Sequence, residues 1–245
     1  MQLIIDVGNT YVKFGLFNNK QLQHVFRLRP KQCTLTVLKS LFQAHTNITK
    51  IYFGSVVPSF NKPFTKTLLT LFHIKPQIIL AKDFVPSFHQ LAKLNLSEIG
   101  TDILAFALSI SRLHSKALGI CFGTATFAVA INTHKIYGVV IAPSIATGIN
   151  NLTTQTAMIK INGDQITSLT NNLGHDTHSA IAGGSYHMFM GFINNLKTYC
   201  VRKYNIHHVY LTGGRIKQLH IKQNAHLKII HHAVLLGYAM ITGNY

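Results

Sequence analysis

The chain has 245 residues, of which 47% are hydrophobic and 12% charged, a composition typical of a folded globular protein and not of a disordered one. Lysine and arginine number 23 against 6 acidic residues, so the formal net charge is +17 and the pI is near 10.0. The basic residues form no continuous block and do not alternate with aromatic residues, which argues against nucleic acid as a partner.

The cysteines and the apolar runs predict where the protein works. Cys33, Cys121 and Cys200 are odd in number and far apart, which favours reduced thiols in the cytosol over a disulfide framework. No apolar run approaches the ~20 residues that cross a bilayer, and the first residues lack the basic region of a secretion signal. We therefore expect a cytoplasmic protein without membrane association.

In the first half of the chain, the hydrophobic periodicity predicts three strands followed by alternating helices and strands. An apolar run ends at Asp6, a Gly-Asn-Thr turn follows, and an alternating segment completes a β-hairpin over residues 3–17. The elements expected next are a strand at 23–28, a helix at 34–44, a strand at 50–57, a helix at 62–72, a strand at 77–80, an irregular connection at 84–98 and a helix at 103–113.

The second half opens with an echo of the first, because residues 117–131 repeat the strand, x-Gly-Thr turn and strand of residues 3–17. The elements expected after it are a strand at 136–142, a helix from about 150, a polar loop at 162–178, a helix at 179–199, a strand at 208–211 and a helix at 233–242. The repeat predicts an α/β protein with two domains, 1–115 and 116–245, and a nucleotide in the cleft between them.

The first turn carries groups that suit a polyphosphate and its metal. Gly8 has no Cβ, so a ligand can approach the backbone amides, which can point at an anion. Asp6 at the strand end can hold Mg²⁺ directly or through water. An ordinary Asn-Gly hairpin turn is the alternative for this stretch taken alone. The residues expected to bind ATP phosphates here are Asp6, Val7, Gly8, Asn9, Thr10 and Lys13.

Seven short motifs, in order and in register, resemble those of the type III pantothenate kinases, which belong to the actin, Hsp70 and sugar-kinase superfamily. They span residues 3 to about 237, and together they are far more specific than any one of them. The matches are residues 6–15 to the first phosphate motif, 55–58 to a strand-end motif, 99–102 to the Gly-x-Asp-Arg substrate motif, 122–126 to the second phosphate motif, 141–143 to a following strand, Thr177 with Gly184 and Gly191 to a dimer-facing helix region, and 212–214 to the adenosine motif.

The resemblance implies two ribonuclease H-like domains with mixed sheets flanked by helices, in a homodimer. It implies transfer of the ATP γ-phosphoryl group to the primary hydroxyl of pantothenate, the first step of coenzyme A biosynthesis, with Mg²⁺ and a monovalent cation, K⁺ or NH₄⁺, as cofactors. Asp102 would accept or orient the proton of the attacking hydroxyl. The alternative for Asp102 is a helix N-cap, worth about 1 kcal/mol.

The resemblance also assigns the remaining site residues. The second phosphate motif would act through Gly123 and Thr124, and the adenosine motif through Thr212, Gly213 and Gly214; tight turns and a loop hinge are the alternatives. Asp176 is expected to be a helix cap or a surface charge. The expected pantothenate-binding residues are Lys93, Gly100, Thr101, Asp102, Ile103 and Thr177, the last acting from the partner subunit in the family.

Three positions depart from the family pattern. Cys121 stands where the family has an aspartate that helps to bind the monovalent cation, and a thiol is a poor ligand for K⁺. Ile103 replaces an arginine that could pair with the pantothenate carboxylate, and Lys93 replaces a tyrosine. We therefore keep three hypotheses: an active, cation-independent kinase; a catalytically impaired homologue acting as a nucleotide-binding or regulatory accessory protein; and, from the charge alone, a polyanion-binding protein.

Overall fold

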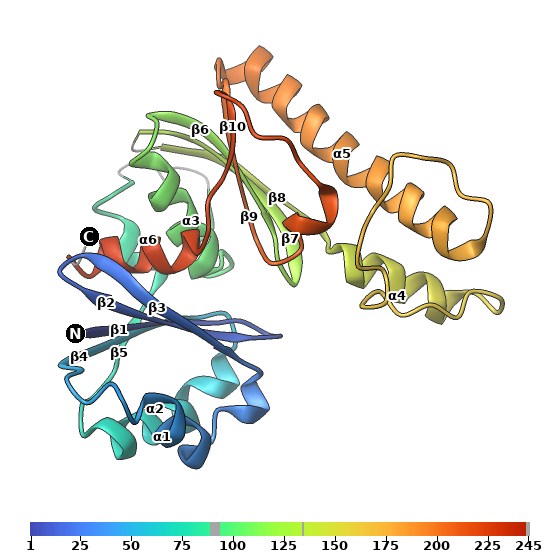
Figure 1. Cartoon of the computed structure of the whole chain (residues 1–245). Helices are drawn as coiled ribbons and strands as arrows, with labels where there is room; N and C mark the ends of the chain where they lie inside the picture. The colour runs from blue at the N-terminus through green and yellow to red at the C-terminus, as the bar shows by residue number, and fades with distance from the viewer. Residues whose placement is uncertain (89–93, 134, 244–245) are drawn as a thin grey trace. The chain divides into compact units, whose positions relative to one another are not determined.

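The computed structural model describes residues 1–88, 94–133 and 135–243 and divides the chain into two compact units (Figure 1). The first unit contains Met1–Arg112 together with Ala233–Tyr245, and the second contains Leu113–His232. The boundary expected between residues 115 and 116 therefore lies close to the observed one. The assignment of the last segment to the second domain differs from the structure, in which the C-terminal helix belongs to the first unit.

The first unit is built on a five-stranded sheet of order β3-β2-β1-β4-β5. Its central strand β1 runs antiparallel to β2 and parallel to β4, so that Asp6 lies between Lys13 on β2 and Gly54 on β4. The hairpin that the alternating pattern predicted is thus confirmed. The strands are β1 (Gln2–Val7), β2 (Val12–Asn18), β3 (Gln21–Leu28), β4 (Lys50–Ser55) and β5 (Gln77–Ile79).

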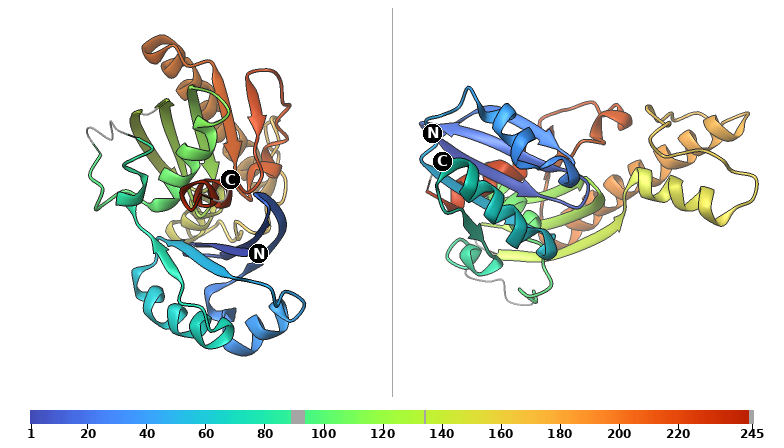
Figure 2. Two further views of the ribbon diagram at one scale, coloured as in Figure 1. Left: turned by 90° about the vertical axis from the view of Figure 1, so that its left-hand side faces the viewer. Right: turned by 90° about the horizontal axis from the view of Figure 1, so that it is seen from below.

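Helices cover both faces of this sheet, as Figure 1 and the left view of Figure 2 show. The alternate β1 residues Leu3, Ile5 and Val7 share a buried cluster with Leu38 of α1 and Phe64 of α2, because successive strand residues point to opposite faces. Asp6 therefore points to the other face, where α3 and α6 pack against each other. The helices are α1 (Leu35–Phe42), α2 (Pro58–Phe72), α3 (Thr101–Ser111) and α6 (Ala233–Ile241), with short 3₁₀ turns η1 (Pro30–Gln32) and η2 (Ala81–Phe84).

The second unit has a sheet of the same strand order, β8-β7-β6-β9-β10 when read from its antiparallel edge. Cys121 on the central strand β6 lies between Phe127 on β7 and Thr212 on β9, the same relation that Asp6 has in the first unit. The internal repeat expected from the sequence is therefore confirmed. The strands are β6 (Lys116–Phe122), β7 (Ala125–Asn132), β8 (Lys135–Pro143), β9 (His208–Thr212) and β10 (Leu227–Ile229).

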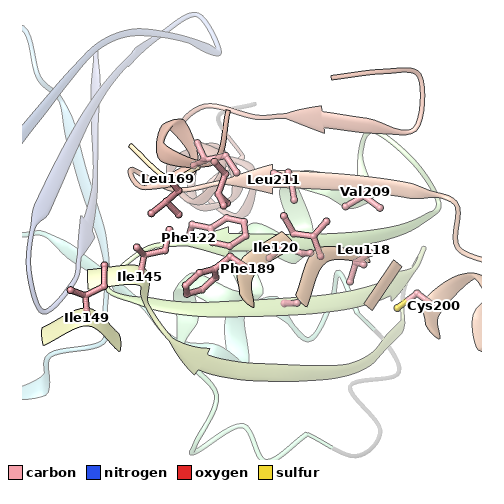
Figure 3. Packing of buried hydrophobic residues seen from close by; sticks show 14 of the residues in the cluster. Leu118, Ile120, Phe122, Ile145, Ile149, Leu169, Phe189, Cys200, Val209 and Leu211 are labelled. Carbon is pink, nitrogen blue, oxygen red and sulfur yellow. The ribbon is translucent and has the colours of Figure 1, made fainter. Parts of the chain in front are cut away.

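The core of the second unit lies between one face of its sheet and helices α4 (Ile145–Gln155) and α5 (Thr177–Tyr204), with the turn η3 (Ile216–Leu219) alongside. Leu118, Ile120 and Phe122 alternate along β6 and pack with Phe189 of α5 and Leu211 of β9, as Figure 3 shows. Within this unit, α4, the start of α5 and the loop between them stand off the sheet as an arm (Figures 1 and 2). In the part of the chain that the structure describes, no helix is both long enough and apolar enough to cross a bilayer.

Candidate active site

A carboxylate and an ammonium group face each other near the carboxyl end of β1. Asp6 and Lys13 occupy paired positions on β1 and β2, and Lys13 Nζ lies 3.0 Å from Asp6 Oδ2. Asp6 is only 7% exposed, whereas the Lys13 side chain is 39% exposed. The pairing compensates part of the cost of burying Asp6 and aligns both groups on the face covered by α3 and α6.

The start of α3 holds the second carboxylate of the first unit. Gly100 is the N-cap of the helix, and Asp102 is its second residue, with Oδ1 accepting the Ile103 amide proton at 2.9 Å. Asp102 is therefore not the N-cap that the sequence left as an alternative, although it does satisfy a first-turn amide. A Cβ at Gly100 would overlap Asp102 Oδ1. Because glycine has no side chain, the Asp102 carboxylate can occupy this position.

The surroundings of Asp102 favour its neutral form. The pKa of the Asp102 carboxyl is raised from 3.8 to about 6, mainly by burial and to a smaller extent by the negative charge of Asp6. The hydrogen bond from Ile103 and the charge of Lys13 oppose this shift without cancelling it. A carboxylate whose pKa lies close to neutrality is suited to accept a proton from a hydroxyl group.

Two residues that sequence reasoning did not identify complete this cluster. Tyr238 of α6 is fully buried, and its hydroxyl forms a 2.9 Å hydrogen bond with the hydroxyl of Thr101. Its ring fills the space above Gly54, where a Cβ would overlap Tyr238 Cζ. An isolated tyrosine in a terminal apolar helix gives no sequence signal of this role, because the contacts join segments distant in the chain.

The first turn differs from expectation in one respect. The Gly8 amide donates to the Tyr11 carbonyl at 3.0 Å and closes the hairpin, so the expectation that this amide points at an anion is wrong. Gly8 also has no positive φ, and so its turn does not depend on the conformational freedom of glycine. Asn9 and Thr10 are exposed and remain the parts of the turn that a phosphate can approach. Val7 contributes its carbonyl to the Val56 amide at 3.1 Å.

The second turn is one residue tighter than the first and is also closed by a backbone hydrogen bond of its glycine. The Gly123 amide donates to the Ala125 carbonyl at 3.2 Å, as Gly8 does to Tyr11. The Thr124 carbonyl accepts from the Thr147 hydroxyl at 3.5 Å, and Ser144 caps α4 by accepting the Thr147 amide. The first turn of α4 is thereby held beside the second phosphate turn. The helix begins at Ile145 and not near residue 150, because Ser144 is its cap.

The Thr-Gly-Gly segment serves the fold of the second unit. Gly213 has φ +110°, and a Cβ there would overlap the backbone of Phe122, so glycine is required for this close approach. The Thr212 hydroxyl donates to the Ile230 carbonyl at 2.7 Å and ties β9 to the segment after β10. Both observations give Thr212 and Gly213 structural roles in the second unit; Gly214 follows directly in the same turn.

Of the two equivalent strand positions, the first carries a donor that suits a metal cation and the second does not. Mg²⁺ takes one or two carboxylates together with substrate phosphates, and Asp6 with Asp102 nearby fits this requirement. Cys121 is a buried thiol, 8% exposed, at the position equivalent to Asp6. K⁺ is a hard cation that binds oxygen ligands, so this residue does not fit the monovalent cation.

The remaining predicted substrate residues are Thr177, Ile103 and Lys93. Thr177 is the exposed first residue of α5, and Asp176 caps that helix by accepting the Ser179 amide at 2.9 Å, which confirms the prediction of a cap. The Ile103 side chain is only 5% exposed, and the residue supplies its amide to Asp102. Lys93 lies outside the described residues. The structure thus brings together Asp6, Lys13, Gly100, Thr101 and Asp102 in the first unit, and Cys121, Gly123, Thr124, Thr212, Gly213 and Gly214 at equivalent strand ends of the second.

Comparison with known proteins identifies the family. The family model for type III pantothenate kinases matches residues 2–198. The chain belongs to the type III pantothenate kinase family. Similar members include those of Mycoplasmopsis synoviae (28% identity; 98% of this chain and 95% of that protein covered) and Sulfurihydrogenibium sp. (31%; 89% of each). The enzymes that give this family its name are ATP-dependent kinases, and the resemblance recognised in the sequence motifs is confirmed.

Solved structures place this family member in the expected fold. A Baf family protein from Campylobacter jejuni, whose name ascribes transcriptional activation to it, has a TM-score of 0.62 at 16% identity and covers 98% of this chain and 97% of its own. A ROK family glucokinase from Streptomyces griseus, solved with glucose and AMPPNP, has a TM-score of 0.51 at 12% identity and covers 98% of each chain. The predicted pair of α/β domains, each with a mixed sheet flanked by helices, is confirmed.

Proposed function

We propose that this chain transfers the γ-phosphoryl group of ATP to the primary hydroxyl of pantothenate and forms 4′-phosphopantothenate, the first step of coenzyme A biosynthesis. Membership of the family supports this activity, and the observation that carries it is the pair of carboxylates in the first unit. Asp102, with its pKa raised to about 6 and Asp6 nearby, has the properties of a base beside a metal ligand.

The proposed roles follow from the chemistry of each group. Asp102 takes the proton from the pantothenate hydroxyl. The hydroxyl oxygen forms a bond to the γ-phosphorus while the bond between the γ-phosphorus and the ADP oxygen breaks. Asp6 holds Mg²⁺, which supplies neutralisation of the phosphate charge when ATP is bound, and Lys13 adds a positive charge. Gly123 and Thr124 bind phosphate, the segment 212–214 binds adenosine, and Gly100, Thr101 and Thr177 contact pantothenate.

Two further parts of the proposal concern the cation and the assembly. Turnover does not require K⁺ or NH₄⁺, because a buried thiol replaces the oxygen ligand at Cys121. The protein acts as a homodimer in the cytoplasm, and Thr177 at the start of α5 reaches the pantothenate of the partner subunit. Nucleic acid and membranes are not partners.

The test is a coupled kinase assay that measures ADP release with pantothenate and with a small panel of other hydroxy acids and sugars, each with and without K⁺. We expect turnover with pantothenate alone among these acceptors, at the same rate in both salts. Asp102→Asn should lower kcat by about 10²- to 10⁴-fold, the usual range for a lost general base.

A matched control is Asp83→Asn, which makes the same change at a carboxylate whose bond to the Leu80 amide an asparagine oxygen can keep. This variant should retain the activity of the parent protein. Binding of ATP without turnover of any acceptor would refute the kinase proposal and leave the nucleotide-binding accessory protein. Turnover that depends on K⁺ would overturn the statement about Cys121.

A further inference from the structure

The C-terminal helix places one hydroxyl group inside the carboxylate cluster of the first unit. Tyr238 belongs to α6, and its side chain is fully buried against α3 and β4. Its hydroxyl lies 2.9 Å from Thr101 Oγ1, and either hydroxyl can donate the proton. Thr101 is the first residue of α3 and precedes Asp102, so this bond joins α6 to the turn that carries the candidate base.

The space for this tyrosine comes from Gly54. A Cβ at residue 54 would overlap Cζ, Cε1 and the hydroxyl oxygen of Tyr238, all of them rigid parts of a buried ring. Gly54 pairs with Asp6 across β1 and β4, so the ring lies over the strand next to the metal-binding carboxylate. Phe84 lies on another side of the ring, with 6.4 Å between ring centroids. The phenol is thus held between Gly54, Phe84 and Thr101.

The electrostatic surroundings keep this hydroxyl protonated. Burial raises the pKa of Tyr238 well above 10, and the negative charges of Asp6 and Asp102 add to the shift. The hydrogen bond to Thr101 lowers the pKa without reversing the shift. Tyr238 therefore neither accepts a proton from substrate nor ionises, and its contribution is restricted to orientation.

We propose that Tyr238 is a positioning residue, which fixes Thr101 and through it the first turn of α3 so that the Asp102 carboxylate keeps its direction. Gly54 leaves the space that the ring of Tyr238 occupies, because it has no side chain. The inference rests on the proposed function in one respect only, namely that Asp102 is the base. The hydrogen bond and its effect on the α3 turn can be tested without turnover.

The first variant is Tyr238→Phe, which keeps the ring and removes the hydroxyl. We expect kcat to fall about tenfold, with KM for ATP changed less than about twofold and the melting temperature nearly unchanged. Tyr210→Phe is a matched control, because it removes the hydroxyl of another buried tyrosine, which bonds to His114 in the second unit. The control should retain the parent kcat, and a parent-like kcat in Tyr238→Phe would overturn the proposal.

A double-mutant cycle identifies the route of the effect. Thr101→Val removes the other hydroxyl of the same bond, so Tyr238→Phe should add no further loss of kcat in the Thr101→Val background. Losses that multiply in the double variant would show that Tyr238 does not act through Thr101, and would reject the inference.

Hydrogen exchange separates this inference from the proposed function. In Tyr238→Phe, amides of the first α3 turn, including Ile103, should exchange faster, whereas those of α2 should be unchanged. If the parent protein turns over no acceptor but this exchange difference is seen, the kinase proposal fails and the positioning contact stands. Unchanged exchange in α3 would reject the contact, whatever the activity.

The requirement for glycine at residue 54 can be tested separately. Gly54→Ala should destabilise the protein strongly, because the ring cannot move aside in a buried site. Combining Gly54→Ala with Tyr238→Leu removes the ring and should recover most of the lost stability, but not the kcat, since the hydroxyl is still absent. Recovery of the parent kcat in this pair would overturn the role of the hydroxyl.

Discussion

The pKa of Asp102 is raised above the usual range for an aspartate, because the carboxyl is largely removed from solvent and lies near Asp6. Its pKa of about 6 predicts that the free protein loses its base as the pH falls below 6. With only six acidic residues in the chain, ¹³C labelling of the carboxyl groups should resolve one that titrates near pH 6. That signal should be absent in Asp102→Asn. Titration of every carboxyl below about pH 5 would contradict the prediction.

The same shift has a consequence for stability. The pKa of Asp102 is higher in the folded protein than in the unfolded chain, so its contribution to folding is complete below about pH 4 and is lost as the pH rises through 6. At pH 7.5 the negative charge of this partly buried carboxylate therefore costs stability. Asp102→Asn should raise the melting temperature at pH 7.5 and not at pH 4, which would separate its loss of activity from unfolding.

Gly100 controls the direction of the Asp102 side chain. A Cβ at this position would overlap Asp102 Oδ1, which is the far end of a side chain that can rotate away. Gly100→Ala should therefore lower kcat about tenfold or more while changing the free energy of unfolding by less than about 1 kcal/mol. Gly138→Ala on β8 is a suitable control, because a Cβ there has no atom within 4 Å. Equal losses of stability and activity in Gly100→Ala would count against this account.

At the scale of the element, the sequence predicted most of the strands and helices and several of their ends. Alternation of apolar residues located both hairpins, since it records which face of a strand is buried. The sequence predicts the start of α2 four residues late, at 62; Pro58 both ends the preceding strand and fits the first turn of the helix. β10 has only three residues and exists through its pairing with β9, which no local pattern reveals.

The candidate site was predictable to a different extent in its different parts. Asp6, Gly100 and Asp102 lie in short motifs next to turns, where residue type and spacing already restrict the chemistry. Tyr238 and Gly54 were not found, because their roles depend on α6 folding back against α3, and the contacting residues Thr101 and Tyr238 are 137 residues apart in the chain. The hydrogen bond from the Gly8 amide to the Tyr11 carbonyl was not predicted either, because it follows from the hairpin geometry and not from residue type.

At the scale of the whole molecule, one strand order is used twice with different chemistry. Asp6 and Cys121 occupy the same place on the central strands of the two sheets, yet one is a charged oxygen ligand and the other a buried thiol. The carboxylate pair is confined to the first unit. Both of its supports, α3 and α6, come from the ends of that unit's two chain segments.

This arrangement predicts that the last residues of the chain are needed for the first unit and not for the second. A chain ending at His232 lacks α6, whose buried Ala233, Leu235 and Tyr238 pack on the first unit. Hydrogen exchange should become faster in β1 and β4 and remain slow in β6 and β9, because each sheet loses protection only with its own packing. A synthetic peptide of residues 233–245 added to the shortened chain should restore part of the protection in β1 and β4. If β6 and β9 lost protection instead, α6 would belong energetically to the second unit, and the role inferred for Tyr238 would be rejected with it.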